Sequence, residues 1–360
     1  MNGDEAKRLG ERLLAEVEVT DLSEVLKAFH SLKSNDNQSI DEAGTPKNSY
    51  FNIPELDNLV SGPQPPILEL VSPPSIYQPS GSGKTSLLYL IIATAILPRT
   101  IHSSISLSSQ EAAVVLFDPL HHFSVARLAE VCFHMLKTAL QASNHPLDAP
   151  TFVVMKSIVK TSLLHLHVFR PSSWSSFLST LRDLPTYLFD HTQHASLHRR
   201  IHSLILEDID AFVPSLRSTT SGGAQALPSA SSSLTFQLSK LSSLLSAAVI
   251  LTSRSTSPRY YRPVLPSSWP RDVSVTRLAL RRVPVRGFAA GISVEEAEQE
   301  REKRWEVVRR ARFECWKVGM AVQGSTSTST TTTTTSGGGG RGSGGFVFRV
   351  GVGIEMERDK

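Results

Sequence analysis

Three apolar runs, each ending in a polar residue, constrain the fold of this 360-residue chain more than any other feature. The runs are AAVVLFD at 112–118, HSLILED at 202–208 and AAVILTS at 247–253. Strands that are apolar without alternation are typical of parallel sheets covered by helices on both faces. The segments with helical character are 85–97, 125–140 and 173–189, and the further predicted strands are 67–72 and 163–169. The sequence therefore predicts an α/β fold with a mainly parallel central sheet flanked by helices.

Composition divides the chain into parts of different character. The parts are N-terminal helices and a polar linker at 1–50, the core at 51–290, a charged helix within 291–324, a disordered Ser/Thr/Gly linker at 325–345 and terminal strands at 346–360. Helical apolar spacing predicts the first helices at 4–16 and 21–32, and a Ser293–Glu296 capping box opens the helix at 293–312. Alternation at 273–280 predicts a half-buried antiparallel strand, so the C-terminal strands are expected to be antiparallel.

Arginines are concentrated between residues 254 and 286, although the net charge of the chain is only +4. This segment contains eight arginines and one acid, Asp272, and is expected to face a polyanion. The candidates for contact with single-stranded or branched DNA are Arg254, Arg259 and Arg262, with Tyr260, Tyr261 and Trp269 for base stacking. A basic surface loop followed by an edge strand explains the same composition equally well.

Composition also argues against several classes of protein. Cys132 and Cys315 are too few for a disulfide framework or a four-thiolate zinc site, which favours a reducing compartment. No apolar run reaches the ~18 residues of a membrane span, so no membrane partner is expected. The first ten residues, MNGDEAKRLG, lack a basic region followed by an apolar one, and an unsecreted, soluble protein is predicted.

The stretch QPSGSGKTSLLYL at 78–90 has the second half of a phosphate-binding loop, between a predicted strand and a predicted helix. The candidates for nucleotide binding are Gly81, Ser82, Gly83, Lys84, Thr85 and Ser86. In such a loop the backbone N–H groups converge on phosphate oxygens, the lysine reaches the terminal phosphates, and the threonine hydroxyl joins Mg²⁺. Gln78 replaces the first glycine, and residues 73–80 make the turn unusually long. The loop is therefore expected to be remodelled, with reduced affinity.

A nucleotide site of this class needs an acid at the end of a second buried strand, to hold the water shell of Mg²⁺. The run HSLILED supplies Glu207 and Asp208, and the choice between them is open at this point. Hydrolysis also needs a group that orients the attacking water, expected just after VVLFD. That position offers no carboxylate beyond Asp118, so no catalytic residue is assigned.

These segments, in this order, resemble the RecA-like DNA recombinase family, and within it the short eukaryotic repair paralogues of fungal type. The segments that carry the resemblance are FNIPELDNLV, GSGKTSLLYLIIATAILP, VVLFDPLHHFSVARL, HSLILEDIDAF, VSVTRLALRR and FVFRVGVGIEME. The resemblance implies a RecA-like P-loop NTPase core at 51–290 that binds ATP. It also implies a nuclear role in homologous recombination and replication-fork repair, within a hetero-oligomer of recombinase paralogues that assists the strand-exchange protein.

Two positions depart from the family pattern. Leu120 stands where active members carry a glutamate, and leucine cannot polarise water. Arg254 stands where relatives often place an asparagine or glutamine that senses the phosphate. The expected protein binds ATP weakly or structurally and is at most a weak DNA-dependent ATPase.

Other interpretations of the same sequence stay open. An unrelated P-loop kinase would need an arginine-bearing lid and a carboxylate base, and neither pattern is convincing. If the altered loop no longer binds nucleotide, the chain is an interaction module of a repair complex. A further alternative is that residues 73–80 result from an incorrectly assigned gene boundary. Four histidines at spacings of three and four (His191, His194, His198 and His202) favour a solvated helix followed by a strand over a metal site. His121 and His122 follow a predicted strand that ends near the expected nucleotide site. A contact with phosphate or with a partner is one interpretation of these histidines, and an ordinary core or surface position is the favoured one.

Overall fold

A computed structural model describes residues 49–60, 65–77, 81–101, 105–218, 226–257, 260–283, 291–318 and 345–357. Several expectations fall outside these ranges: the N-terminal helices at 4–16 and 21–32, Gln78, Arg259 and the linker residues 325–344. Among the described residues, no helix combines the length and apolar character needed to cross a membrane.

Within the described part of the chain, nine strands form one sheet in the order β11-β10-β9-β8-β1-β7-β6-β4-β5. Six neighbouring strands run parallel: β1 (Ile67–Ser72), β4 (Ala113–Phe117), β5 (Leu166–Phe169), β6 (Ile201–Leu206), β7 (Ala248–Arg254) and β8 (Val275–Arg282). The antiparallel side consists of β9 (Arg312–Lys317), β10 (Gly345–Val350) and β11 (Ile354–Glu357). A separate short hairpin pairs β2 (Thr100–Ile101) with β3 (Ile105–Ser106). The predicted mixed α/β fold with a mostly parallel sheet and antiparallel C-terminal strands is confirmed.

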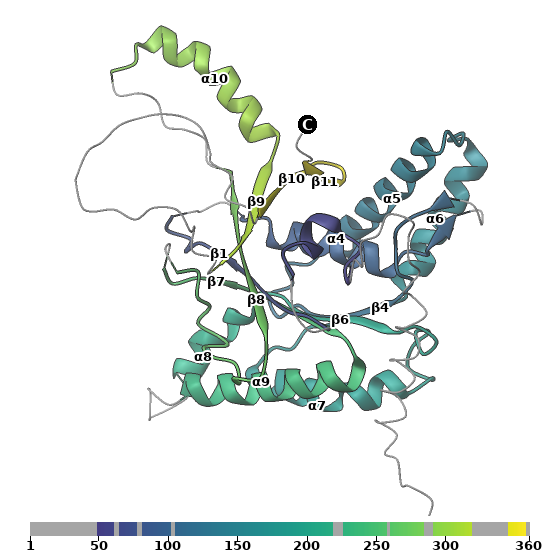
Figure 1. Ribbon diagram of the computed structural model, residues 1–360, viewed down its shortest axis with the longest axis vertical. Coiled ribbons are helices and arrows are strands. Elements are labelled where there is room, and N and C mark those ends of the chain that lie inside the picture. Colours follow the sequence, from purple (N-terminus) through teal and green to yellow (C-terminus); the bar gives the residue numbers. More distant parts are fainter. Residues whose placement is uncertain are drawn as a thin grey trace, which may run out of the picture.

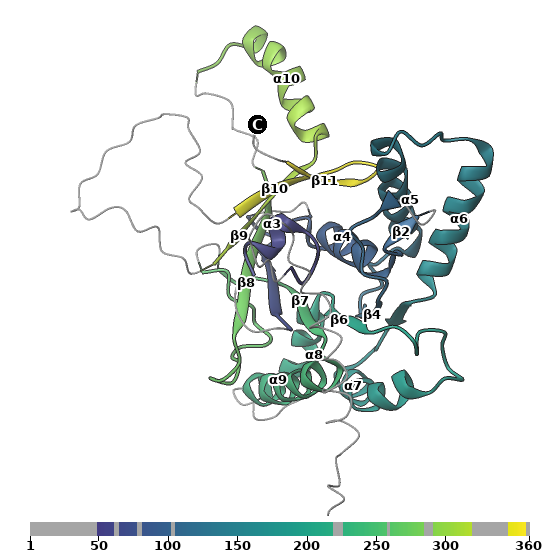
Figure 2. The same cartoon turned by 45° about the vertical axis from the view of Figure 1, so that its right-hand side comes forward.

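Helices cover both faces of the sheet (Figures 1 and 2). One face carries α4 (Lys84–Ile96), α5 (Val125–Ala142) and α6 (Ala149–Leu163), and the other carries α7 (Trp174–Phe189), α8 (Val213–Ser218) and α9 (Ala226–Leu245). Shorter elements are α3 (Pro54–Asp57) and the 3-10 turn η1 (Ile209–Phe212), and α10 (Val294–Arg309) projects away from the sheet. The capping box that opens α10 is confirmed by hydrogen bonds between Ser293 and Glu296.

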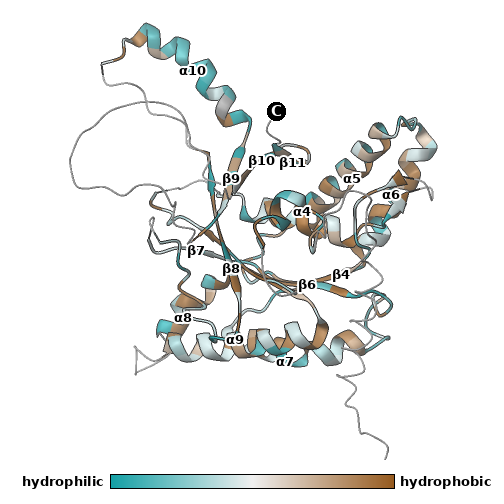
Figure 3. Ribbon diagram, viewed as in Figure 1, coloured by the Kyte–Doolittle hydropathy of each residue, from teal (hydrophilic) through white to brown (hydrophobic). Residues whose placement is uncertain are grey.

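The two-sided cover explains why the central strands are mainly apolar and why β4 is apolar at every position. In β4, Val114 and Leu116 pack into the core under α4 and α5, whereas Val115 and Phe117 pack into the core under α7 and α9. Because successive strand side chains point to opposite faces, a strand buried on both faces cannot alternate. The apolar colour of these strands, between two helical layers, is visible in Figure 3.

Among the longer elements that were not predicted are the helices α6 and α9 and the strand β9. Helix α9 is rich in serine, a residue with weak helix preference, yet Leu234, Leu238, Leu241 and Leu245 form a buried stripe along one side. Helix α6 occupies the segment before β5, so that strand begins at Leu166 instead of residue 163. Strand β9 follows α10 directly, after Ala311 at φ +42°, so the helix predicted to reach residue 312 ends at Arg309.

The strand predicted at 273–280 is present as β8, but the prediction that it pairs antiparallel is wrong for one of its two neighbours. Strand β8 pairs in parallel with β1 and only its other edge pairs antiparallel, with β9. The half-buried alternation is present only at the start of the strand, where Thr276 is buried between the partly exposed Val275 and Arg277, and the next three residues are all buried. Alternation reports one exposed face of a strand and is silent on the direction of its neighbours.

Candidate functional site

The phosphate loop and the ends of β1, β6 and β7 surround a cavity of about 520 Å³. This is a volume typical of small-molecule sites. The cavity is lined by Ser72, Pro73, Gly81, Ser82, Gly83, Lys84, Thr85, Ser86, His122, Asp208, Arg254, Arg282 and Phe313. The six loop residues proposed to bind nucleotide therefore share one wall, and the segment GSGKT introduces helix α4 as predicted.

Gly83 caps the N-terminus of α4 in a conformation that favours glycine. Its φ is +87°, in the left-handed region. A Cβ atom at this position would lie 2.7 Å from Cδ1 of Phe313 and 3.0 Å from Cζ of Phe348. The loop is thus packed directly against aromatic rings from the C-terminal strands.

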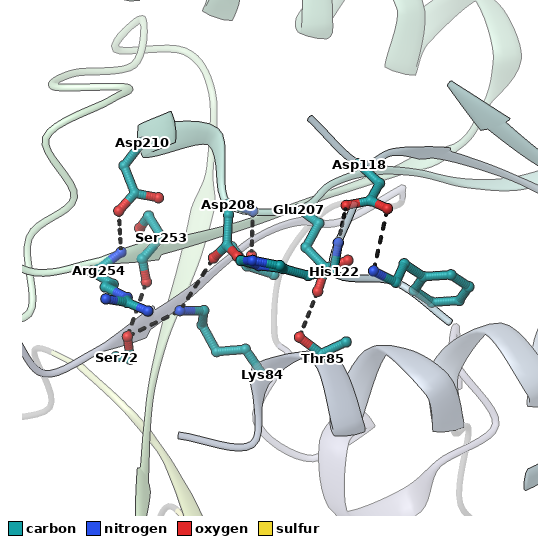
Figure 4. A network of polar contacts seen from close by, with 12 residues as sticks. Ser72, Lys84, Thr85, Asp118, His122, Glu207, Asp208, Asp210, Ser253 and Arg254 are labelled. Atoms are coloured by element: carbon teal, nitrogen blue, oxygen red, sulfur yellow. Dashed lines mark hydrogen bonds and ion pairs between the residues drawn. The ribbon is translucent and has the colours of Figure 1, made fainter. Parts of the chain in front are cut away.

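Lys84 is buried beneath the loop and lies among both acids and cations. Its Nζ donates to Ser72 Oγ at 3.0 Å and lies 3.6 Å from Asp208 Oδ1 (Figure 4). Burial lowers the pKa of Lys84, Asp208 and Asp210 oppose this shift, and Arg254 adds to it. The Lys84 ammonium therefore lies at the cavity wall with fewer hydrogen-bond acceptors than it would have in water, which is why burial lowers its pKa.

Thr85 and Glu207 join the two segments on which the nucleotide interpretation depends. The Thr85 hydroxyl donates to Glu207 Oε1 at 2.5 Å, so the phosphate loop and the acidic end of β6 meet as predicted. Glu207 is 1% exposed, and its Oε2 has no hydrogen-bond partner among the described residues. Burial raises the pKa of Glu207 to about 7, and the Thr85 hydrogen bond only partly offsets this effect.

This donor set fits a magnesium ion. Mg²⁺ takes oxygen ligands, keeps several waters, and needs only one or two carboxylates together with a hydroxyl and phosphates. The unpartnered Oε2 of Glu207 beside the Thr85 hydroxyl provides such oxygens, whereas Asp208 is occupied by Lys84. Of the two acids in HSLILED, Glu207 is therefore the better candidate, and Asp208 contributes through its charge.

The turn after β4 reaches the same site. Asp118 is fully buried and accepts hydrogen bonds from the backbone N–H groups of His122 and Phe123, which fixes the turn. This places His122 Nδ1 3.1 Å from Asp208 Oδ2 at the cavity wall. Leu120 is 45% exposed and brings no polar atom to the turn. Of the two histidines considered from sequence, only His122 lines the cavity.

Asp210, Arg282 and Phe313 belong to the site, and sequence reasoning did not assign them to it. Asp210 accepts from the backbone N–H of Arg254 at 3.1 Å, and burial raises its pKa. Arg282 and Phe313 enter from β8 and β9, with the guanidinium of Arg282 5.9 Å from the centroid of the Phe313 ring. The arginine-rich composition of residues 254–286 included Arg282 but did not indicate that it reaches this cavity. No sequence pattern indicated that Asp210 or Phe313 belongs to the site.

The arginine-rich segment is only partly available to DNA. Tyr261 packs edge-on against Trp316, and the indole N–H of Trp269 donates to Glu69 at 2.6 Å. Both side chains are therefore engaged within the fold, whereas the sequence predicted that they would be available to stack on bases. Tyr260 is 66% exposed. Arg262 is exposed, while Arg254 lines the cavity.

The predicted helix of histidines is wrong, because His191, His194 and His198 lie in turns between α7 and β6. His202 lies on β6 as expected. The ring of His194 packs 4.8 Å from that of His167, and Ser196 hydrogen-bonds the rings of His165 and His167. In the described part of the chain, no cluster of three or more His, Cys, Asp or Glu side chains is arranged to hold a metal.

No protein-family model matches this chain, and no curated protein matches it significantly.

Proposed function

We propose that this chain is an ATP-binding RecA-like recombinase paralogue that holds ATP with Mg²⁺ and hydrolyses it weakly or not at all. In this role it is a nuclear subunit of a hetero-oligomeric paralogue complex. The complex assists the strand-exchange protein in homologous-recombination repair of double-strand breaks and stalled forks. The geometry of the site supports nucleotide binding, and the sequence resemblance supports the repair role.

The observation that carries nucleotide binding is the hydrogen bond between Thr85, in the wall of the cavity, and Glu207 at the end of β6. It brings a glycine loop at a helix N-terminus, which attracts phosphate, next to an acid with an unpartnered buried oxygen, which attracts a cation. Lys84 lies between the loop and the acidic end of β6, where the terminal phosphates would draw its ammonium away from Asp208. Triphosphate with Mg²⁺ is the ligand that satisfies all three groups.

Weak hydrolysis is argued from the turn that follows β4. Hydrolysis needs a side chain that orients the attacking water, and Leu120 has only hydrocarbon to offer. The nucleotide is therefore proposed to order the loop and the strand ends around it, as part of an interface between subunits.

The test is a titration of the full chain with a fluorescent ATP analogue in the presence of Mg²⁺. Lys84→Ala is expected to weaken binding about tenfold or more, because a charge-assisted contact to phosphate is lost. Lys156→Ala, which changes an exposed lysine on α6, is the matched control and should bind as the wild type does. Absence of binding in the wild type and in Lys84→Ala alike would overturn the proposal and favour the nucleotide-free interaction module.

The repair role has its own test. The tagged full chain, purified from cells, is expected to bring down recombinase paralogues that mass spectrometry identifies. Recovery of no such partner, together with phosphoryl transfer to a small molecule, would instead favour the kinase.

A further inference from the structure

Helix α10 projects away from the sheet, and none of its described side chains is buried (Figures 1 and 2). The guanidinium of Arg282 on β8 donates to the carbonyl of Val308 at 2.8 Å, which ties the C-terminal end of the helix to the sheet. Val294 and Trp305 are 76% and 62% exposed, and the guanidinium of Arg309 lies 5.5 Å from the centroid of the Trp305 ring. Tryptophan is enriched at protein interfaces, and most helical stability comes from packing, so this helix is open to a partner.

Four exposed side chains form a stripe along the helix, which we call the α10 stripe: Val294, Glu298, Arg301 and Trp305. Their positions differ by four, three and four residues, so they lie on one side of the helix. This spacing is that of the core positions of a two-stranded coiled coil. The two ends of the stripe are apolar, and its centre carries one charge of each sign. Polar residues at such core positions fix the register between two helices.

The two charges of the α10 stripe differ from neighbouring charges of the helix in their partners. Arg304 pairs with Glu300 one turn earlier, at 2.7 Å. Across the residues that the structure describes, neither Glu298 nor Arg301 takes part in an ion pair. The stripe is therefore complementary to a surface that presents the same two charges in the reverse order.

A second copy of α10 that runs antiparallel presents that surface. When Val294 lies opposite Trp305 of the second copy, Glu298 falls opposite Arg301, because both pairs have the same midpoint in the helix. A two-fold axis through this midpoint then produces two contacts between valine and tryptophan and two ion pairs. A parallel pair would instead place each charge opposite its own kind, which is destabilising.

We propose that two copies of this chain associate through their α10 helices, which pack antiparallel along the α10 stripe. This association goes beyond the proposed function and does not depend on nucleotide binding. The helix has 16 residues and is about 24 Å long, so the contact is smaller than the ~1,200 Å² typical of stable interfaces. The dimer is therefore weak, with a dissociation constant on the order of 10 to 100 μM. At the lower concentrations of unfolding experiments the chain is a monomer, and Glu298 is an ordinary surface residue.

Sedimentation equilibrium of the full chain, over a concentration series that brackets this value, tests the association. Arg301→Glu turns both ion pairs into repulsions and should raise the dissociation constant about tenfold or more. Glu298→Arg should do the same. The double variant Glu298→Arg/Arg301→Glu exchanges the two charges and should restore the wild-type constant. Lys303→Glu makes the same change of charge on the opposite side of the helix and is the matched control.

Cross-linking tests the direction of the two helices. A mixture of the Val294→Cys chain and the Trp305→Cys chain should be joined by a short bismaleimide, because these positions lie opposite each other in the antiparallel pair. Neither variant alone should be joined to itself. The native Cys132 and Cys315 are buried and do not compete for the reagent.

Each contrary result identifies a different error. A wild type that stays monomeric throughout the concentration series overturns the association. A dimer that both single charge reversals leave unchanged forms through another surface, which also overturns it. If the double variant does not regain the dimer, or if one cysteine variant is joined to itself, the antiparallel pairing is wrong. Circular dichroism should show an unchanged fold in every charge variant, because Glu298, Arg301 and Lys303 are exposed.

Discussion

The buried carboxyl group of Glu207 makes the stability of the metal-free protein depend on pH. Burial raises its pKa from 4.5 to about 7 in the folded chain. Since the folded state has the higher pKa, it holds the proton more firmly between these values. The stabilising contribution is therefore complete below pH 4.5 and is lost as the pH rises to 7. A difference of about 2.5 pKa units corresponds to about 3 kcal/mol of unfolding free energy.

Glu207→Gln isolates this effect, because glutamine imitates the protonated carboxyl and still accepts from Thr85. We expect the variant and the wild type to have similar unfolding free energies at pH 4.5 in a chelator. At pH 8 the variant should be more stable, by about 3 kcal/mol. Urea unfolding at the two pH values measures both, and Glu298→Gln, an exposed change on α10, should show no such pH dependence.

Magnesium provides the second half of the test. At pH 8, Mg²⁺ with ATP should stabilise the wild type more than the Gln variant, because the cation compensates the buried charge. The reasoning would be refuted by an unfolding difference between wild type and Glu207→Gln that is the same at pH 4.5 and pH 8. Such a result would mean that the carboxylate is already compensated by the protein.

Three further changes test the fold around the site. Gly83→Ala adds a Cβ at φ +87°, 2.7 Å from the Phe313 ring, and should cost about 2 to 4 kcal/mol; an unchanged melting temperature would contradict this. Arg277→Ala leaves the carboxylate of Glu69, 1% exposed, without its 2.6 Å ion pair and should cost about 3 to 5 kcal/mol in urea unfolding, a loss that Glu69→Gln in the same chain should reduce. Burial lowers the pKa of His202 to about 3, so its contribution is present above pH 6.5 and is lost on acidification, by about 2 kcal/mol between pH 6.5 and 5. His202→Gln should show a smaller acid-induced change, and equal changes would argue that His202 is not buried as a neutral ring.

The centre of the fold could be predicted because its signals are local. Strands β1, β4, β6 and β7 are buried on both faces, so each is mainly apolar in the sequence, and β4 is apolar throughout. The glycine loop and the acid after β6 follow from the same logic, because parallel strands end at one edge of the sheet. That edge brings Thr85 and Glu207 together across a sequence separation of 122 residues.

The rest of the site depends on pairings that no local pattern contains. Arg282 and Phe313 reach the cavity only because β8 pairs with β1 and then with β9. In β9, RFECWK carries three charges and directly follows a charged helix, so nothing local separates the strand from α10. Arg254 was visible in the sequence, but its two possible partners, phosphate of a nucleotide and phosphate of DNA, attract arginine by the same chemistry.

The pairing of β9 with β10 has a practical consequence for anyone who wishes to label this protein. Trp316 and Gly345 are register partners, so the two ends of the intervening sequence are held beside each other by the sheet itself. The entropy of closing a connection grows slowly, by about 0.6 kcal/mol for each doubling of its length. A fluorescent domain or an affinity tag inserted between these strands should therefore leave the folded core intact.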